Sequence, residues 1–287
     1  MTISRTAGHR VNQRNRGFDK RYIAILAVVA VVAVAGIAYA VWPSSPSYTP
    51  MVGADHAGSL VLNDSGSQLV SWNKTSSYCS SDSISQPTGT VSTDSSGDAT
   101  LTTTGKPSSC VAMISPNAYS ASVIEADIDF PALPSKPSTI ANWTSFWLTN
   151  QATWPVDGEL DAVEAAPVTG KNTVSWHSGP NESSVFVAST DTFHQTRLPI
   201  KGPNLTPGWH VVDIVYTKGS FAVYYDGQEY TSYSSSKVTG SALNILLTST
   251  VTPKSDAAWN LIGGPEVNSA TSPATIAVKY LRVWSYK

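Results

Sequence analysis

Residues Ser122–Phe130 read SVIEADIDF, and this stretch gives the clearest indication of the fold. Alternate positions from 124 to 130 are Ile, Ala, Ile and Phe, whereas those from 123 to 129 are Val, Glu, Asp and Asp. A period of two residues is typical of a β-strand with one buried face. The stretch therefore predicts a half-buried strand.

Further strands are expected on both sides of this stretch, because short runs rich in Val, Ile, Thr and aromatic residues alternate with Gly, Pro, Asn and Asp clusters. No convincing helical period is visible between them. Asp226-Gly227 is a strong turn signal. The pattern predicts an all-β fold, an antiparallel β-sandwich or jelly roll in one domain. The clearest further strands are His210–Tyr216, Ser220–Tyr225, Leu243–Thr248 and Ile276–Tyr286.

The N-terminal part of the chain differs from the rest. Residues 1–21 are basic, and residues 22–42 contain no charge over a length that would span roughly 30 Å as a helix. No Lys or Arg follows until Lys74, so we expect a cytoplasmic N-terminus and a membrane helix at 22–42. Ala38-Tyr39-Ala40 leaves a cleaved signal sequence open as the alternative.

The exported part is expected to begin with a linker. Residues 43–58 are rich in Pro, Ser and Gly, and residues 59–287 form the expected sandwich domain. The domain would then lie on the extracellular face of the membrane, anchored through residues 22–42, or be secreted. Two cysteines, Cys79 and Cys110, fall in this part. A disulfide between them is expected in an oxidising compartment, with two unpaired buried thiols as the alternative.

Charge excludes one class of partner. The formal net charge of the 287 residues is −2, and no basic stripe occurs in the exported part. Nucleic acid is therefore not an expected partner. A monomer is expected.

One short segment concentrates acidic residues in a chain of which only 13% is charged. Glu159, Asp161 and Glu164 lie within the string WPVDGELDAVEA. Two carboxyl groups that face one sugar are the working parts of most glycoside hydrolases. Three acids on a solvated strand face are the alternative interpretation.

The spacing of these acids predicts an irregular strand. In a regular strand Glu159 and Asp161 point the same way and Glu164 points to the opposite face. A β-bulge within Ala162–Val163 would bring all three carboxylates onto one face, and bulges are common beside active sites.

The segment resembles the Glu-x-Asp-x-x-Glu signature of glycoside hydrolase family 16, in its laminarinase-like branch with the concanavalin A-like lectin/glucanase fold. The resemblance extends over about 200 residues. SVIEADIDFP is similar to the family's strand that leads into the cleft, and ANWTSFWLTNQATWPVDGELDAVEA to its Trp-rich approach to the catalytic strand. GWHVVDIVYTKGSFAVYYDG and VKYLRVWSY are similar to the hairpin and the closing strand that follow.

The resemblance implies roles for the three acids. Glu159 would be the nucleophile, Glu164 the general acid/base, and Asp161 a partner that hydrogen-bonds the nucleophile and tunes both titrations. Some family members bind a structural calcium ion, but this sequence has no decisive ligand string. No cofactor and no metal are expected.

Aromatic side chains near the acids are candidates for stacking on sugar rings. The resemblance favours Trp143 and Trp154 as platforms, whereas Trp147 is equally compatible with the core. Trp176 and His177 are further candidates for the substrate site. Glu125 could line the cleft, although its place in an alternating strand explains it equally well.

The resemblance, which includes the WPxxGE lead-in of laminarinase-like members, implies a retaining endo-glycosidase of β-linked polysaccharide. β-1,3-Glucan is the first expected substrate and mixed-linkage glucan the next. A cell-wall transglycosylase, a galactan-cleaving hydrolase and a non-catalytic lectin-like module remain as alternatives, since a fold alone does not determine function.

Overall fold

The computed structural model describes residues 48–72, 74, 88–106, 109–150, 152–154, 156–166, 171–178, 183–187, 204–251 and 273–287. The chain divides into two units, and Ser47–Lys287 form the second of them. The predicted membrane segment 22–42 lies outside the described residues. Among the described residues, no helix is long and apolar enough to cross a membrane.

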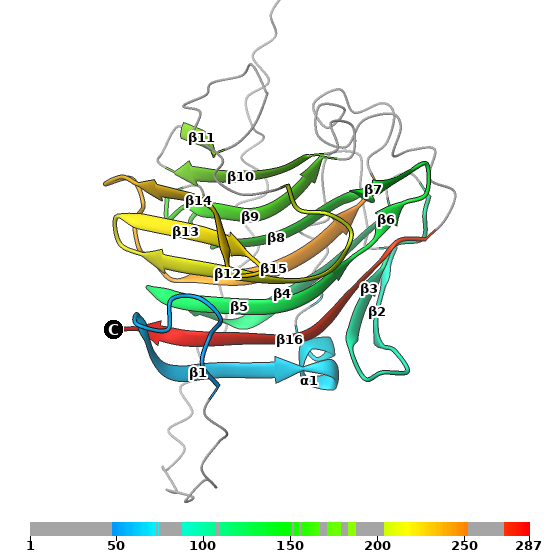
Figure 1. Cartoon of the computed structure of the whole chain (residues 1–287), viewed down its shortest axis with the longest axis horizontal. Coiled ribbons are helices and arrows are strands. Elements are labelled where there is room, and N and C mark those ends of the chain that lie inside the picture. Colours follow the sequence, from blue (N-terminus) through cyan, green and yellow to red (C-terminus); the bar gives the residue numbers. More distant parts are fainter. Residues whose placement is uncertain are drawn as a thin grey trace, which may run out of the picture. The chain divides into compact units, whose positions relative to one another are not determined.

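Two antiparallel sheets form the second unit (Figure 1). The larger sheet has eight strands in the order β14-β13-β12-β5-β16-β3-β2, with β1 also paired to β16. Its strands are β1 (Ala57–Ser65), β2 (Thr90–Thr93), β3 (Ala99–Thr102), β5 (Ser122–Phe130), β12 (Gly208–Thr217), β13 (Ser220–Tyr225), β14 (Gln228–Ser234) and β16 (Thr275–Tyr286).

The smaller main sheet has six strands in the order β11-β10-β9-β8-β15-β4. A short helix, α1 (Gly66–Val70), follows β1, and β6 (Ala132–Leu133) pairs with β7 (Lys136–Ile140) as a separate hairpin. The six strands are β4 (Cys110–Tyr119), β8 (Trp143–Thr149), β9 (Glu159–Ala166), β10 (Lys171–Ser178), β11 (Ser183–Val187) and β15 (Leu243–Thr250).

The prediction of an all-β antiparallel sandwich is confirmed. The expected strands Ser122–Phe130 and Ser220–Tyr225 have the observed bounds of β5 and β13. Strands such as β4 and β8 did not stand out in the sequence. Apolar and small polar residues are mixed along β4, and two Trp residues of β8 lie on its outward face, so neither strand shows a simple alternation of apolar and polar residues.

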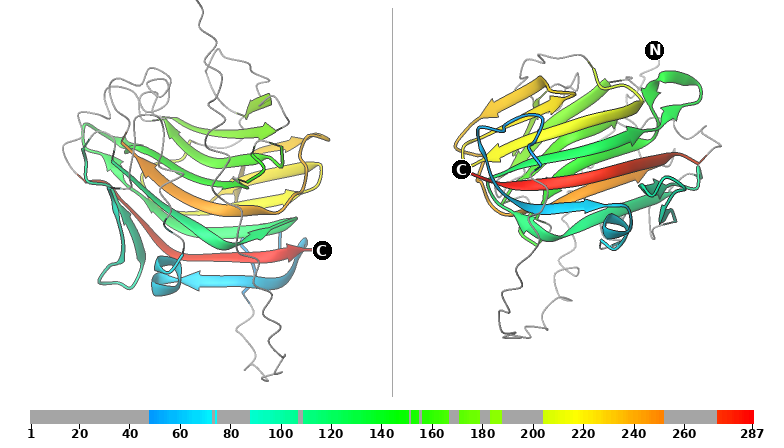
Figure 2. Two further views of the ribbon diagram at one scale, coloured as in Figure 1. Left: turned by 180° about the vertical axis from the view of Figure 1, so that it is seen from behind. Right: turned by 60° about the horizontal axis from the view of Figure 1, so that its bottom comes forward.

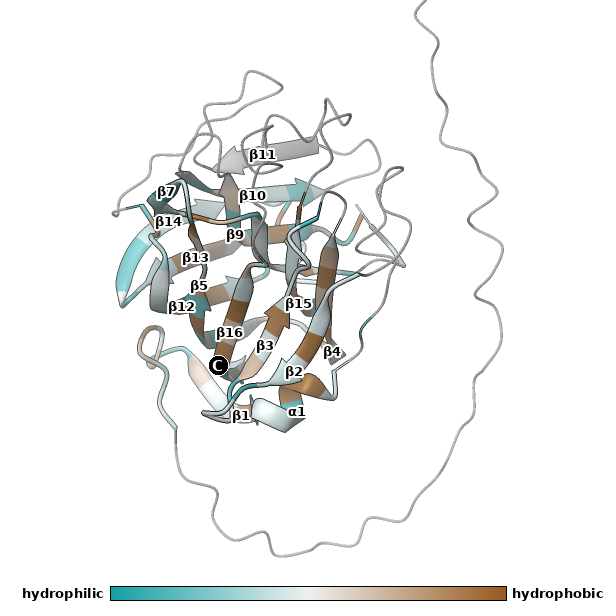
Figure 3. Cartoon of the chain, turned by 90° about the vertical axis from the view of Figure 1, so that its right-hand side faces the viewer, coloured by the Kyte–Doolittle hydropathy of each residue, from teal (hydrophilic) through white to brown (hydrophobic). Residues whose placement is uncertain are grey.

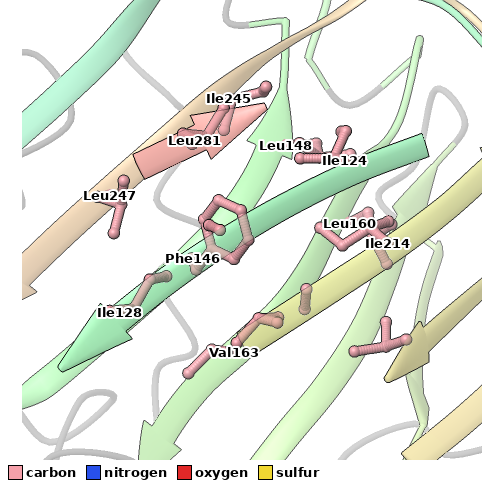
Figure 4. Close-up of a cluster of buried hydrophobic side chains, with 14 of the residues drawn as sticks. Ile124, Ile128, Phe146, Leu148, Leu160, Val163, Ile214, Ile245, Leu247 and Leu281 are labelled. Carbon is pink, nitrogen blue, oxygen red and sulfur yellow. The ribbon is translucent and has the colours of Figure 1, made fainter. Parts of the chain in front are cut away.

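Side chains from the two sheets meet in a single large hydrophobic core. Ile124, Ile128, Ile214 and Leu281 enter it from the eight-stranded sheet (Figure 4). From the six-stranded sheet come Phe146, Leu148, Leu160, Val163, Ile245 and Leu247. Hydrophobic residues accordingly run along central strands such as β15 and β16 (Figure 3). Each sheet therefore has one buried face and one outer face.

The folded unit begins within the predicted linker 43–58. The Trp284 indole N–H donates to the carbonyl oxygen of Tyr48 over 3.1 Å, and the Arg282 guanidinium lies 3.8 Å from the centre of the Tyr48 ring. Figure 2 shows this N-terminal segment (blue) beside the C-terminal end of β16 (red). Residues from Tyr48 onward thus pack on the outer face of the eight-stranded sheet.

Cys110 begins β4, is fully buried and is disulfide-bonded. The Thr250 hydroxyl donates to its Sγ over 3.3 Å. Cys79, its expected partner, lies outside the described residues, so the pairing stays a prediction.

Gly158, which precedes β9, cannot accept a side chain. Its φ is +105°, and an added Cβ would lie 2.2 Å from Cη2 of the core residue Trp176.

We expect Gly158→Ala to lower the free energy of unfolding by about 3–5 kcal/mol, because backbone strain and overpacking add. Gly97 also has a positive φ, +87°, but nothing within 4 Å of an added Cβ. Gly97→Ala should therefore cost only about 1–2 kcal/mol. Equal losses of the two variants in urea unfolding would contradict the predicted clash.

Candidate active site

Strand β9 contains an extra residue relative to both of its neighbours. Against β10, Asp161 pairs with Ser175 and Glu164 with Thr173, so three steps on β9 match two on β10. Against β8, Asp161 pairs with Trp147 and Val163 with Phe146, and the register again skips Ala162. The predicted β-bulge is therefore present, and Ala162 is the inserted residue.

The bulge places the three acidic residues in three adjacent cross-strand rows. Glu164 lies between Ser145 and Thr173. Asp161 lies between Trp147 and Ser175, and Glu159 between Thr149 and His177. Directly paired residues project to the same side of a sheet. These rows therefore occupy the outer face of the six-stranded sheet, opposite Leu160 and Val163 in the core.

His177 connects two of the acids. Its Nε2 lies 3.2 Å from Asp161 Oδ2 and 3.7 Å from Glu159 Oε1. The Ser175 hydroxyl donates to Asp161 Oδ2 and lies 3.2 Å from the same His177 nitrogen. One imidazole edge is thus shared by two carboxylates and a hydroxyl.

His177 carries a positive charge at neutral pH. Burial opposes that charge, but the hydrogen bond and charge of Asp161, with the charges of Glu159 and Glu164, raise the pKa to about 9. An imidazolium beside two carboxylates compensates part of their mutual repulsion. The same imidazolium lies beside both Glu159 and Asp161.

The Glu164 carboxyl holds its proton to a higher pH than an ordinary glutamic acid does. Burial raises the pKa of its carboxyl to about 7, and the nearby charge of Asp161 adds to the rise. The hydrogen bond from Thr173, the Trp143 side chain and the positive His177 oppose it. The Thr173 hydroxyl donates to Glu164 Oε2 over 2.8 Å. A carboxyl with a pKa near 7 can give and take a proton in neutral solution.

A metal ion is the other occupant to consider for this cluster. One donor atom each from Glu159, Asp161 and His177 lies within 4.8 Å of the others, a spacing that could hold an ion. However, the raised pKa of His177 means that its ring nitrogen already holds a proton at neutral pH. A metal ion at this position would have to displace that proton, because only a neutral imidazole binds a metal.

Tryptophan residues from the approach to β9 flank the acids. Trp143 begins β8, and its side chain opposes the rise in the pKa of Glu164. Trp147 lies directly opposite Asp161 and donates from its indole nitrogen to the Thr248 hydroxyl over 3.2 Å. The sequence left Trp147 either beside the substrate or in the core. Its side chain lies on the outer face and not in the core. Trp154 is 39% exposed in the turn before β9.

Trp176 was wrongly predicted as a substrate-binding residue. Its side chain is fully buried in the hydrophobic core, with its ring centre 6.2 Å from that of Tyr216 and 6.1 Å from that of Phe221. Since successive residues of a strand point to opposite faces, Ser175 and His177 reach the outer face only if Trp176 points inward.

Glu125 was also wrongly placed in the cleft. It lies on β5, in the eight-stranded sheet, and its neighbours Ile124 and Ala126 point into the core. Its carboxylate accepts the Met51 backbone N–H over 2.6 Å and lies 3.4 Å from Nη1 of Arg282. Glu125 therefore binds the N-terminal segment on the far face of the sandwich.

Two residues of the site, Thr173 and Ser175, were not predicted from the sequence. Both contact the acids directly. The string NTVSWHS carries the signal that could have identified them, because Thr173, Ser175 and His177 alternate with Val174 and Trp176. Polar side chains at every second position of a strand beside an acidic strand would share its face.

A protein family model matches this part of the chain. Residues 67–204, which include β8, β9 and β10, match the model described as "XgeA-like, catalytic GH16 domain". No curated protein sequence matches the chain.

Several solved structures have a similar fold at low sequence identity. A family 16 enzyme of the Bacteroides ovatus mixed-linkage glucan locus, bound to its product, has a TM-score of 0.54 and 13% identity, covering 78% of this chain and 99% of that one. The Thermotoga maritima laminarinase catalytic domain has a TM-score of 0.53 and 13% identity, with coverages of 79% and 98%. A third, from work on endo-acting O-glycanases of the human gut microbiota, has a TM-score of 0.53 and 14% identity, with coverages of 80% and 100%.

The family model matches the segment that contains the Glu159–Glu164 signature, and the similar structures share the sandwich around it. Residues 67–204, which include the three acids of the signature, are thus similar to the catalytic domain of glycoside hydrolase family 16, XgeA-like type.

Proposed function

We propose that this domain is a retaining endo-glycoside hydrolase of β-linked polysaccharide, with β-1,3-glucan or mixed-linkage β-1,3-1,4-glucan as substrate. One observation carries the proposal. The bulge at Ala162 gathers Glu159, Asp161 and Glu164 on one face, where one acid faces an imidazolium and another has a pKa of about 7. A double displacement needs one ionised and one protonated carboxyl group.

In the first step Glu159, kept ionised beside His177, attacks the anomeric carbon. Glu164, protonated below a pH of about 7, gives its proton to the departing glycosidic oxygen. The bond to the leaving sugar breaks and an ester to Glu159 forms. Asp161 holds His177 between itself and Glu159 and keeps the pKa of Glu164 high.

In the second step Glu164, now ionised, removes a proton from a water molecule. The water attacks the anomeric carbon, releases Glu159 and leaves the sugar with its original anomeric configuration. A sugar hydroxyl in place of water would give transglycosylation with the same residues.

The substrate assignment rests on the face around the acids. Trp143 and Trp147 present aromatic surface beside Glu164 and Asp161, as stacking on the C–H face of a sugar requires. Two structures of similar fold are named for mixed-linkage glucan and for laminarinase activity, which supports glucan as the first polymer to test. The O-glycanase neighbour makes mucin O-glycans the second group to test.

The expected location follows from residues 1–42, which lie outside the described structure. We propose that the domain works outside the cytoplasmic membrane, either anchored through residues 22–42 or released after Ala40. Protease treatment of intact cells tests this: loss of the domain epitope supports an external site, and full protection contradicts it.

Substitution of the two glutamates tests their roles. Glu159→Ala should lower kcat on polysaccharide by about 10³-fold or more, since no covalent intermediate can form. Glu164→Ala should lose about 10²–10⁴-fold on polysaccharide but little of the first step on a 2,4-dinitrophenyl glycoside, whose leaving group needs no proton.

Reducing-sugar release is the measurement, on laminarin, mixed-linkage glucan, agarose, carrageenan and mucin O-glycans. Wild-type release that disappears in Glu159→Ala identifies the substrate. A folded protein that binds one polymer without cleaving it would replace the enzyme by a lectin-like module. An equal loss of Glu164→Ala on both kinds of substrate would exclude it as the general acid.

The pH dependence gives an independent test of Glu164. Its protonated form is the active acid, so kcat/KM should fall as the pH rises through about 7. Asp161→Asn removes a charge that raises this pKa and should move the alkaline limb to lower pH. Thr173→Val removes a hydrogen bond that lowers the pKa and should move the limb to higher pH. Shifts in the same direction, or none, would show that another group controls this limb.

A further inference from the structure

The bulge in β9 disturbs backbone hydrogen bonding at a buried position. Ala162 is fully buried and has no register partner in β8 or in β10. Buried N–H and C=O groups near such an insertion need partners outside the regular ladder, because a buried polar group without a hydrogen bond is destabilising.

Two side chains supply these partners. Tyr225, at the end of β13 in the opposite sheet, donates from its hydroxyl to the carbonyl oxygen of Ala162 over 2.7 Å. Asn172, on β10, accepts the backbone N–H of Glu164 with its Oδ1 over 2.9 Å. The Asn172 amide also donates to the Tyr225 hydroxyl. One continuous chain of hydrogen bonds thus runs from Ala162 to Glu164, and we call these two side chains the bulge clamp.

The hydrogen bonds of the bulge clamp are shielded from water. Asn172 is 1% exposed and Tyr225 is 5% exposed, so water does not readily replace either group. The Tyr230 hydroxyl donates to the Asn172 carbonyl oxygen over 3.0 Å, and its ring centre lies 4.6 Å from that of Tyr225. Burial raises the pKa of Tyr225 well above its usual value, so its hydroxyl keeps the proton that it donates.

The bulge clamp holds the part of β9 that follows the inserted residue, where Glu164 lies. Glu159 and Asp161 precede the inserted residue, whereas Glu164 follows it and is held through its own backbone N–H. Without the insertion, Glu164 would turn to the core face, where Val163 now lies. The side of the sheet that Glu164 occupies therefore depends on the bulge.

We propose that Tyr225 and Asn172 are positioning residues that hold the β9 bulge and thereby keep Glu164 directed at the substrate. The inference rests on the proposed function for its catalytic consequence, because it assumes that Glu164 is the general acid/base. Its structural part concerns the bulge alone and can be tested without substrate.

The structural test is hydrogen exchange at the Glu164 amide, in the full chain. Tyr225→Phe and Asn172→Ala should both speed this exchange by about tenfold or more, as loss of about 1.4 kcal/mol of protection implies. The matched control is Tyr216→Phe, because Tyr216 is equally buried but donates to the Ser241 carbonyl oxygen, away from β9. Unchanged exchange in both clamp variants, or the same change in the control, overturns the inference.

The catalytic test compares polysaccharide with a 2,4-dinitrophenyl oligosaccharide. Both clamp variants should lose about tenfold or more in kcat/KM on polysaccharide, a part of the acid/base contribution. The burst of dinitrophenol should stay within about twofold of wild type. Azide attacks the anomeric carbon of the glycosyl-enzyme in place of water, releases Glu159 and needs no general base. It should therefore accelerate steady-state turnover of both clamp variants but not of Tyr216→Phe.

Glu164→Ala serves as the reference in the same assay. If it shows the azide acceleration and the clamp variants do not, the positioning role is wrong and the proposed function stands. If Glu164→Ala itself shows no acceleration, the acid/base assignment fails and the catalytic part of the inference fails with it. Thermal unfolding of each variant ensures that the comparison is made on folded protein.

Discussion

Ala162 has no cross-strand partner on either side of β9, and the chemistry of the site depends on this irregularity. A regular strand would send Glu159 and Asp161 to one face and Glu164 to the other. With one residue inserted, the three carboxylates share the outer face, while Leu160 and Val163 still fill the core. Asn172 and Tyr225 bind the backbone at the insertion, so packing between the two sheets also supports the site.

The electrostatics follow from this gathering of charge. Three carboxyl groups lie close together on the outer face of the six-stranded sheet, and two protons offset their negative charge. His177 holds a proton between Asp161 and Glu159, and Glu164 takes up a proton near neutral pH. Burial and the charge of Asp161 keep a proton on Glu164 up to a pH of about 7, whereas Glu159 faces the imidazolium of His177. That division of roles is what general acid and nucleophile require.

Much of this arrangement could be predicted from local sequence patterns. The alternation in Ser122–Phe130 gave the bounds of β5, and the spacing of the acids gave the bulge within Ala162–Val163. Trp176 was placed wrongly although the information was present, because it alternates with His177 and cannot share its face. Glu125 could not be placed, since alternation does not say which sheet a strand joins or that residues from Tyr48 onward cover it. Tyr225 comes from the opposite sheet and carries no local signal at all.

We propose that Glu159 and Glu164, brought to one face by the bulge, perform a double displacement. Proton NMR of the first products from the cleaved glucan tests this most directly, because the new reducing end is observed before it mutarotates. With retention, the β-anomer forms first and the α-anomer grows in later. If the α-anomer forms first, the reaction inverts, and Glu159 is not the nucleophile.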